Sequence, residues 1–279
     1  MKLKINELLN YEIIHHYDEN SGDEIKSTGN NFYIKVNGKE CAFSIPGQSK
    51  FLMRFRIFRR FLRYDKSNAV FNWNRDGIVV LFQWKIYFFD LNNKELIYIN
   101  NLKQCRNVLH GGIAVTSNTI CFGEYGHNPN REPVPIWTSN DDGRSFSIAK
   151  ELVEQKIKHI HGIYADKFNE SLWIVTGDFD GECYVIESDD SSFMKLSWYG
   201  DGSQKWRPVS LFFKPNEIIW VMDSPIQKAY LQIFNREKKT IQQGQYFPGP
   251  VWYSKQFKEG DAILQTTVEI GDEVKTRFS

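Results

Sequence analysis

Two histidines two residues apart, His159 and His161, are the strongest candidates for chemistry in this sequence. In an extended strand, residues at positions i and i+2 lie on the same face, so both imidazoles would point the same way. An imidazole titrates near neutral pH and, beside a carboxylate, can act as a general acid or base. The predicted catalytic group contains these histidines and three carboxylates: His161, Glu124, Asp178, His159 and Asp223.

The same two histidines allow two other interpretations. Together with Asp178 or Glu182 they could bind a divalent metal, because imidazole and carboxylate are common ligands of such ions. They could also be structural, with hydrogen bonds that join neighbouring sheets. We expect no metal and no other cofactor, and the metal site at His159 and His161 is kept as an alternative.

Several other polar and aromatic residues could bind a substrate. Arg207 and Arg131 could clamp a carboxylate or a phosphate in bidentate geometry. Tyr125 and Trp206 carry flat rings on which a sugar could stack. The predicted substrate-binding residues are Arg207, Gln204, Arg131, Tyr125, Glu182 and Trp206. Each has a structural alternative, as part of a salt bridge or of the core.

Short apolar runs that recur along the chain must position these residues. They are of strand length and rich in β-branched and aromatic side chains, for example residues 32–36, 77–82 and 172–175. Asn37-Gly38 after the first of them is a strong hairpin signal.

These runs group into a longer repeat. The segments that could begin a set of strands start at Phe32, Val70, Ile113, Ile163, Val209 and Val251. A repeat of about 40 to 50 residues with several strands in each is typical of propeller blades. The sequence therefore predicts an all-β fold, a single β-propeller domain over residues 1–279 with about six blades; five and seven are the nearest alternatives.

Residues 50–63 depart from the strand pattern. Phe51, Phe55, Phe58 and Leu62 fall at helical spacing, and arginines lie on the other side. We expect a short basic amphipathic helix packed on the propeller. Contact with a membrane surface or with an anionic ligand is the alternative.

Composition excludes several classes of protein. Lys and Arg number 35 and Asp and Glu number 34, so the net charge is only +1. Such a small net charge does not attract nucleic acid, and no nucleic-acid partner is expected. The sequence contains no phosphate-binding G-x-x-x-x-G-K-S/T, no G-x-G-x-x-G and no G-x-S-x-G string. Without a C-x-x-C pair, an N-terminal signal peptide or an apolar run of about 20 residues, we expect a cytoplasmic protein with free thiols.

Residues 139–146, Ser-Asn-Asp-Asp-Gly-Arg-Ser-Phe, fit the Asp-box pattern S-x-D-x-G-x-x-F/W. The carboxylate of Asp141 would accept hydrogen bonds across a hairpin turn, which is a structural role. Residues 188–193 resemble a shortened second copy. Further matching strings are Gly-Glu-Tyr at 123–125, His-Ile-His-Gly at 159–162, Thr-Gly-Asp at 176–178, Gln-Lys-Trp-Arg at 204–207 and Asp-Ser-Pro at 223–225.

Over residues 105–260 the chain resembles the Asp-box (BNR) sialidase-like β-propellers, in particular a bacterial branch associated with surface polysaccharides. The resemblance implies the propeller fold and a carbohydrate ligand. Residues 55–58, Phe-Arg-Ile-Phe, lack the proline of the F/Y-R-I-P motif of sialidases. Neither the arginine triad nor the Tyr/Glu pair of sialidases is identified, so a sialidase proper is not expected.

The leading interpretation is a carbohydrate-active enzyme that cleaves a glycosidic bond in an acidic glycan. A hydrolase would use two carboxylates about 5 to 9.5 Å apart. A lyase would use a His or Tyr base, with Arg207 neutralising a uronate. We expect His161, Glu124, Asp178 and Arg207 to meet in one polar depression at the centre. The alternatives are a glycosyltransferase and a non-catalytic glycan-binding scaffold in surface-polysaccharide assembly.

Overall fold

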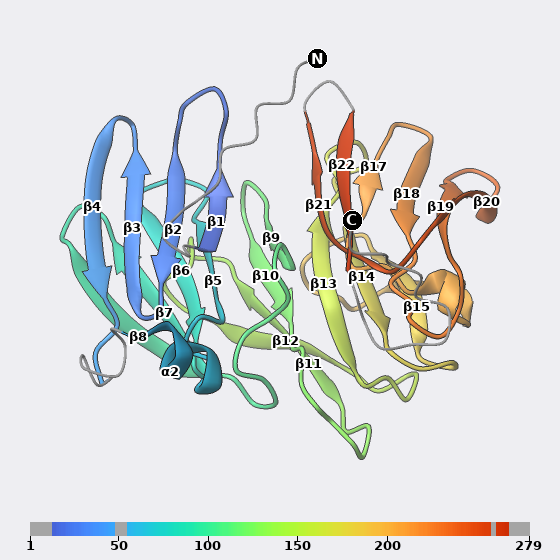
Figure 1. The fold of residues 1–279 in the computed structure, drawn as a ribbon, viewed down its shortest axis with the longest axis horizontal. Helices are drawn as coiled ribbons and strands as arrows, with labels where there is room; N and C mark the ends of the chain where they lie inside the picture. Colours follow the sequence, from blue (N-terminus) through green and yellow to red (C-terminus); the bar gives the residue numbers. More distant parts are fainter. Residues whose placement is uncertain (1–12, 48–54, 258–260, 268–279) are drawn as a thin grey trace.

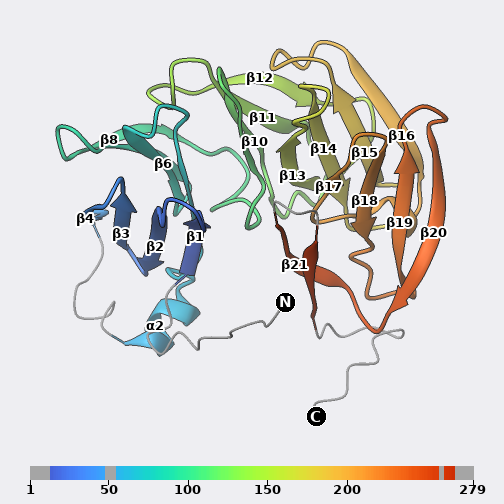
Figure 2. The ribbon, with the colours of Figure 1, turned by 90° about the horizontal axis from the view of Figure 1, so that it is seen from above.

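The computed structural model describes residues 13–47, 55–257 and 261–267, and regular structure there is almost entirely β-strand. Within these ranges the strands form five four-stranded sheets and one two-stranded sheet. The sheets follow one another around a common centre (Figures 1 and 2). The predicted all-β class is therefore confirmed.

In every sheet the neighbouring strands are consecutive in the chain and antiparallel. The first two sheets contain β1 (Ile13–Tyr17), β2 (Glu24–Thr28), β3 (Asn31–Val36) and β4 (Lys39–Ser44), then β5 (Ser67–Phe71), β6 (Gly77–Phe82), β7 (Lys85–Asp90) and β8 (Glu95–Asn101). The next two contain β9 (Ile113–Val115), β10 (Ile120–Gly123), β11 (Val134–Ser139) and β12 (Ser147–Leu152), then β13 (His159–Ala165), β14 (Leu172–Gly177), β15 (Cys183–Ser188) and β16 (Leu196–Gly202). The last two contain β17 (Phe212–Phe213), β18 (Glu217–Val221), β19 (Ala229–Asn235) and β20 (Thr240–Phe247), then β21 (Val251–Gln256) and β22 (Ala262–Thr266).

The first strands of neighbouring sheets meet near the centre. β1 lies against β5, and β9 lies against β13. Side chains on these inner strands and on the loops at their ends can therefore converge although they are far apart in the sequence.

The predicted start points of the repeat agree with the structure over most of the chain. Ile113 and Val251 begin β9 and β21, and Val70 and Ile163 lie within β5 and β13. The start at Phe32 is wrong, because Phe32 lies in β3 and the first sheet begins with β1. That inner strand reads Ile-Ile-His-His-Tyr, so its two histidines hide the apolar pattern on which the prediction relied.

The predicted hairpin at Asn37-Gly38 joins β3 to β4. Both residues have positive φ, 50° and 73°, as a two-residue type I′ turn requires. A second two-residue turn, Gln83-Trp84 between β6 and β7, has φ values of 49° and 68° without a glycine. A bulky residue in this left-handed region is unusual and indicates a local constraint.

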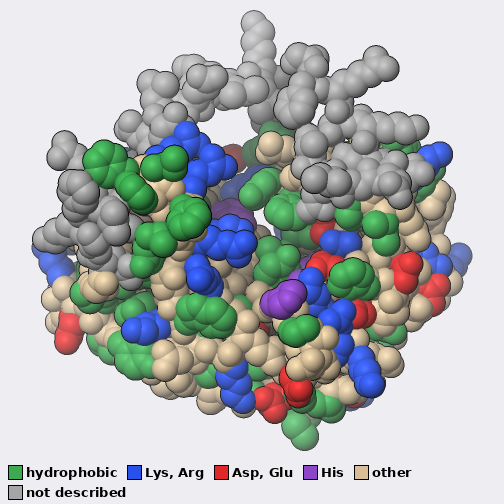
Figure 3. Space-filling model, turned by 60° about the horizontal axis from the view of Figure 1, so that its bottom comes forward, with side chains coloured by type: hydrophobic (Ala, Val, Ile, Leu, Met, Phe, Trp, Pro, Cys, Tyr) green, Lys and Arg blue, Asp and Glu red, His purple; other side chains and the backbone are tan. Residues whose placement is uncertain are grey.

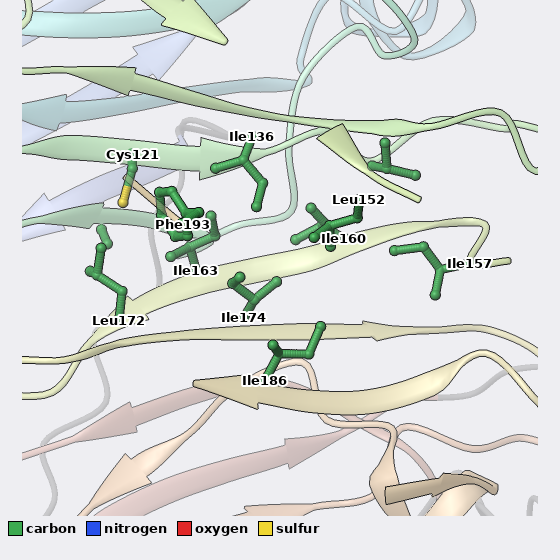
Figure 4. Packing of buried hydrophobic residues seen from close by; sticks show 12 residues of the cluster. Cys121, Ile136, Leu152, Ile157, Ile160, Ile163, Leu172, Ile174, Ile186 and Phe193 are labelled. Carbon is green, nitrogen blue, oxygen red and sulfur yellow. The ribbon is translucent and has the colours of Figure 1, made fainter. Parts of the chain in front are cut away.

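Apolar side chains fill the space between neighbouring sheets. Between the third and fourth sheets, Ile136 of β11 packs with Ile160 and Ile163 of β13 (Figure 4). The two sheets approach closely at Gly123, where a Cβ atom would lie 2.4 Å from Cδ1 of Ile160. This packing fixes β13, and with it both candidate histidines, relative to the third sheet.

The Asp-box-like motif forms the turn between β11 and β12. Oδ1 of Asp141 accepts hydrogen bonds from Oγ of Ser139 and from the Ser145 amide, both at 2.8 Å. The neighbouring Asp142 is buried and reaches the second sheet, where it accepts from the Trp73 amide at 2.8 Å and from Nδ2 of Asn74 at 2.7 Å. Asp142, which the motif does not single out, therefore joins two sheets.

We expect Asp142→Ala to lower the free energy of unfolding by about 2 to 3 kcal/mol, because it removes the acceptor of the Trp73 amide and one acceptor of Nδ2 of Asn72, which is itself buried. Asp141→Ala should cost about 1 kcal/mol, since Asp141 and its donor Ser145 are exposed at the turn. Urea unfolding of both variants measures the difference. An equal or larger loss for Asp141→Ala would contradict this assignment.

The predicted helix at 50–63 is present as α2 (Arg56–Phe61), and Phe51 lies outside the described residues. Its expected orientation is wrong. Phe55 and Phe58, which were expected to pack, are 44% and 41% exposed, whereas Arg59 is buried and pairs with Asp65 at 3.0 Å. The ion pair removes the cost of burying the guanidinium, so helical spacing alone selected the wrong face. No helix in the described part of the chain is long and apolar enough to cross a membrane.

Candidate functional site

β13 begins with the two candidate histidines, and both are almost completely buried. Opposite them, β14 ends at Gly177, and Asp178 follows directly. A Cβ atom on Gly177 would lie 2.6 Å from Cε1 of His161, so only glycine leaves room for this ring. The end of β14 thus brings Asp178 to the two imidazoles.

Backbone carbonyls orient both rings. Nδ1 of His159 lies 2.8 Å from the Gly126 carbonyl oxygen, and Nδ1 of His161 lies 2.9 Å from that of Pro208. Their Nε2 atoms face Oδ1 of Asp178, at 3.4 Å from His159 and 3.2 Å from His161. Two strands and two loops therefore direct three polar atoms toward one point.

Two cations hold the Asp178 carboxylate. Nζ of Lys158 lies 2.7 Å from Oδ2, and Nη2 of Arg207 lies 3.0 Å from Oδ1. Burial alone would raise the pKa of Asp178, but its contacts with His159 and His161 outweigh burial and hold the pKa well below its usual range. Burial lowers the pKa of His161 to about 4, although the hydrogen bond that its imidazolium form would donate to Asp178 opposes this shift.

Arg207 lies behind this group and is 7% exposed. Besides Asp178 it contacts Oδ2 of Asp223 at 3.3 Å and Oε1 of Gln204 at 3.3 Å. Gln204, in the short 3-10 helix η1 (Gln204–Trp206), also donates to the Asp178 carbonyl at 3.1 Å. The structure therefore brings together His159, His161, Asp178, Arg207, Gln204 and Asp223, with Arg207 engaged by protein groups.

Glu124 does not join this cluster. Its buried carboxylate accepts hydrogen bonds from the amides of Lys103 and Gln104 and, at 2.8 Å, from Nε1 of Trp137. Backbone and indole donors engage both oxygens, so Glu124 fastens the loop after β8 to the third sheet.

Three predicted substrate-binding residues are also engaged elsewhere. Arg131 pairs with Glu182 at 2.6 Å, and this pair joins the loop after β10 to the loop before β15. Trp206 is buried in the core, where its ring centroid lies 5.7 Å from that of Trp220. Tyr125, by contrast, lies at the cluster, with its ring centroid 4.0 Å from that of His159.

A cavity of about 340 Å³, here called the basic pocket, adjoins the cluster. Its lining includes His159 and Tyr125 together with four basic residues, and the described residues that line it include no Asp or Glu. The basic residues are Arg63, Lys66, Arg106 and Lys158. Figure 3 shows basic and histidine side chains around a hollow near the middle of this face.

Sequence reasoning missed the basic pocket because its cations come from separate loops. Arg63 and Lys66 follow α2, Arg106 follows β8, and Lys158 precedes β13. Burial lowers the pKa of Lys66, and the charge of Arg63 lowers it further. The concentration of positive charge was visible in the sequence only as the basic character of residues 50–63.

A second cavity, of about 640 Å³, lies between β1, β21 and the loop before β9. Three of the six histidines of the chain line it: His15, His16 and His110. Burial, and then the neighbouring His110, lower the pKa of His15 to about 3. Nε2 of His15 lies 2.8 Å from Oγ of Ser27. This cavity is distinct from the basic pocket and has a different lining.

No protein-family model and no curated protein matches the chain. Among solved structures it is similar to the dihydro-heme d1 dehydrogenase NirN in complex with DHE, with a TM-score of 0.54 and 10% identity, over 85% of this chain and 47% of that chain. It is also similar to the extracellular domain of BT4673 from B. thetaiotaomicron, with a TM-score of 0.58 and 10% identity, over 92% of this chain and 31% of that chain.

The chain thus spans less than half the length of each of these two structures. At 10% identity the likeness concerns the fold alone, and it supports the predicted β-propeller.

Proposed function

We propose that the chain binds an acidic glycan in the basic pocket and cleaves it by β-elimination. The observation that carries this proposal is the gathering of Arg63, Lys66 and Arg106 around one cavity without a lining carboxylate among the described residues, beside Lys158, which pairs with Asp178. Like charges held close together raise the free energy of the empty pocket, and an anionic ligand relieves that repulsion. The position of Lys66 beside Arg63 fits this account.

Aromatic rings at the same pocket favour a ligand in which the anionic group belongs to a sugar. Tyr125 and Trp84 both line the pocket, and Trp84 is 42% exposed. Trp84 keeps a left-handed backbone, with φ at 68°, although glycine would fit this turn better. Backbone strain of this kind persists where function requires the side chain, and a flat apolar ring suits the face of a pyranose.

Elimination fits the pocket better than hydrolysis. A glycoside hydrolase needs two carboxylates on either side of the scissile bond. Glu124 and Asp223 are buried and hydrogen-bonded or ion-paired with protein groups, so neither faces the pocket lining. At a uronic acid, a cation instead stabilises the sugar carboxylate while a base removes the C5 proton. The C4–O bond then breaks, a C4=C5 double bond forms, and the leaving oxygen takes a proton.

In this step we assign charge neutralisation to Lys66 and Arg106, because Lys158 is already ion-paired with Asp178 at 2.7 Å. We assign both proton transfers to Tyr125, which lines the pocket together with these cations: its phenolate would take the C5 proton, and the phenol so formed would return that proton to the leaving oxygen.

We also propose that the six sheets are the blades of one six-bladed propeller, with β21 and β22 in the last blade. Nζ of Lys255 on β21 donates to the Tyr17 carbonyl of β1 at 3.3 Å. The ring centroid of Tyr253 lies 6.4 Å from that of His110. The contact of Lys255 with Tyr17 supports an arrangement in which the last sheet lies beside the first, as ring closure requires.

The function is tested with a panel of uronic-acid oligosaccharides and their carboxyl-reduced, neutral counterparts. We expect binding of the acidic members only and an ultraviolet-absorbing unsaturated product. Lys66→Ala and Arg106→Ala should each raise Kd about tenfold, the loss of about 1.4 kcal/mol. Tyr125→Phe should keep the affinity and lose the product. Lys195→Ala, at an exposed ion pair outside the pocket, is the matched control.

Trp84→Gly adds an independent arm to this experiment. Glycine accepts positive φ without steric cost, so the melting temperature should stay the same or rise while glycan affinity falls. Equal binding of acidic and neutral sugars would contradict the proposal. Binding without any unsaturated product would contradict cleavage and favour the glycan-binding scaffold.

A further inference from the structure

His159, His161 and Asp178 have the arrangement of a metal-binding site. The first observation is the state of the two rings. A backbone carbonyl can only accept a hydrogen bond, so Nδ1 of each histidine carries the proton that it donates to Gly126 or Pro208. In the neutral imidazole the remaining lone pair is then on Nε2. Both Nε2 atoms point toward Oδ1 of Asp178, which is itself an acceptor.

Nη2 of Arg207 contacts Oδ1 of Asp178 at 3.0 Å, but the two Nε2 lone pairs still face that oxygen, which is unfavourable unless a further cation lies among the three atoms. The relevant atoms of His159, His161 and Asp178 all lie within 4.8 Å of one another. Nε2 of His159 is buried and makes no hydrogen bond within the described structure. A buried acceptor without a partner is costly, so this atom points to a missing ligand.

The two distances from Nε2 to Oδ1 fit a shared metal ion. An ion about 2.1 Å from each ligand, at angles between octahedral and tetrahedral, places the ligands about 3.0 to 3.4 Å apart. The Nε2 to Oδ1 distances are 3.4 Å for His159 and 3.2 Å for His161. Charge-assisted hydrogen bonds are shorter, about 2.7 to 2.9 Å. The spacing therefore suits a carboxylate that shares a metal ion with the two histidines better than one that forms charge-assisted hydrogen bonds with them.

The groups behind the ligands also match those of metal sites. Metal-binding histidines usually donate their other ring N–H to a carbonyl or carboxylate, which fixes the tautomer and the direction of Nε2. Here the Gly126 and Pro208 carbonyls have that role. Lys158 and Arg207 fix the Asp178 carboxylate.

We propose that Nε2 of His159, Nε2 of His161 and Oδ1 of Asp178 bind a first-row divalent cation of the zinc class. Two imidazoles and one carboxylate suit such ions and disfavour Mg²⁺ and Ca²⁺, which take oxygen ligands. Three protein ligands leave at least one coordination position open. Lys158 and Arg207 balance the charges of Asp178 and Asp223, so the bound ion adds net positive charge beside the basic pocket.

The test uses the full chain, stripped with a chelator, and no glycan, so its result is independent of the proposed function. Calorimetric titration with Zn²⁺ should show one tight site, and Mg²⁺ should give no heat. Zn²⁺ should also raise the melting temperature, because it binds the folded state. Co²⁺ should give the visible spectrum of a nitrogen- and oxygen-coordinated ion.

The variants His159→Gln, His161→Gln and Asp178→Asn should each weaken Zn²⁺ binding at least about tenfold. His127→Gln is the control for adventitious binding, because His127 is an exposed histidine at the rim of the same pocket. Near-ultraviolet circular dichroism checks that each variant is folded, and His159→Gln is the mildest change because Nε2 of His159 makes no hydrogen bond.

Absence of Zn²⁺ binding by the wild-type chain would overturn the metal site. So would tight binding that His159→Gln and His161→Gln leave unchanged but His127→Gln removes. In either case the cluster is an ion-paired network in which the rings carry a second proton. If the three ligand variants lose Zn²⁺ binding but still bind the glycan, the metal site is supported and the glycan proposal stands.

Discussion

Replacing Arg207 by alanine is expected to lower the free energy of unfolding by about 3 to 5 kcal/mol. The guanidinium is buried between the carboxylates of Asp178 and Asp223, at 3.0 Å and 3.3 Å. Its removal leaves Asp223, which is itself buried, without this cation. Removing one member of a buried ion pair costs much more than the net contribution of the pair, because the remaining charge stays in a poorly solvated place.

Urea unfolding at neutral pH measures this loss. Arg207→Lys should be intermediate, since an ammonium keeps the charge but cannot contact both carboxylates and the Asp178 carbonyl with a planar fork. Lys195→Ala removes an ion pair whose side chains are exposed, and its effect should stay within about 0.5 kcal/mol. A folded Arg207→Ala variant of unchanged stability that lost glycan binding would show that Arg207 contacts the ligand directly.

The sequence identified the polar residues of the site better than their roles. His159 and His161 could be placed on one face of a strand because that depends only on local geometry. The proximity of Asp178 to Arg207 depends on how the end of β14 meets η1, which no local sequence pattern encodes. Arg207 was therefore predicted as a clamp for a ligand, whereas the structure surrounds it with protein carboxylates.

The fold was predictable where its signals are local or periodic. Asn37-Gly38 specifies its hairpin through two positive φ values, and β9 and β21 begin where the repeat predicts. The failures have long-range causes. Arg59 is buried because Asp65 pairs with it, and Asp142 matters because the second sheet supplies its donors. Such partners are set by the packing of one element on another and are invisible in a single segment.

The histidines of the second cavity should make the fold sensitive to acid. His15 has a pKa of about 3 in the folded protein against 6.5 in the unfolded chain, because burial and His110 disfavour the imidazolium. The pKa values of His16 and His110 are lowered in the same direction, chiefly by burial. Below about pH 6.5 the unfolded chain therefore binds more protons than the folded one, and stability falls as the pH falls.

Between about pH 7.5 and about pH 5, His15 alone should remove about 2 kcal/mol of unfolding free energy, a range in which most carboxylates remain ionised. His15→Gln keeps a hydrogen-bonding group for Ser27 but cannot titrate, so its stability should fall about 2 kcal/mol less than that of the wild type over the same interval. Urea unfolding of both chains in metal-free buffer measures the difference. His127→Gln, at an exposed position, should follow the wild type. If His15→Gln kept the full pH dependence, His15 would have to be solvated and protonatable in the folded protein, and the second cavity would be filled with water.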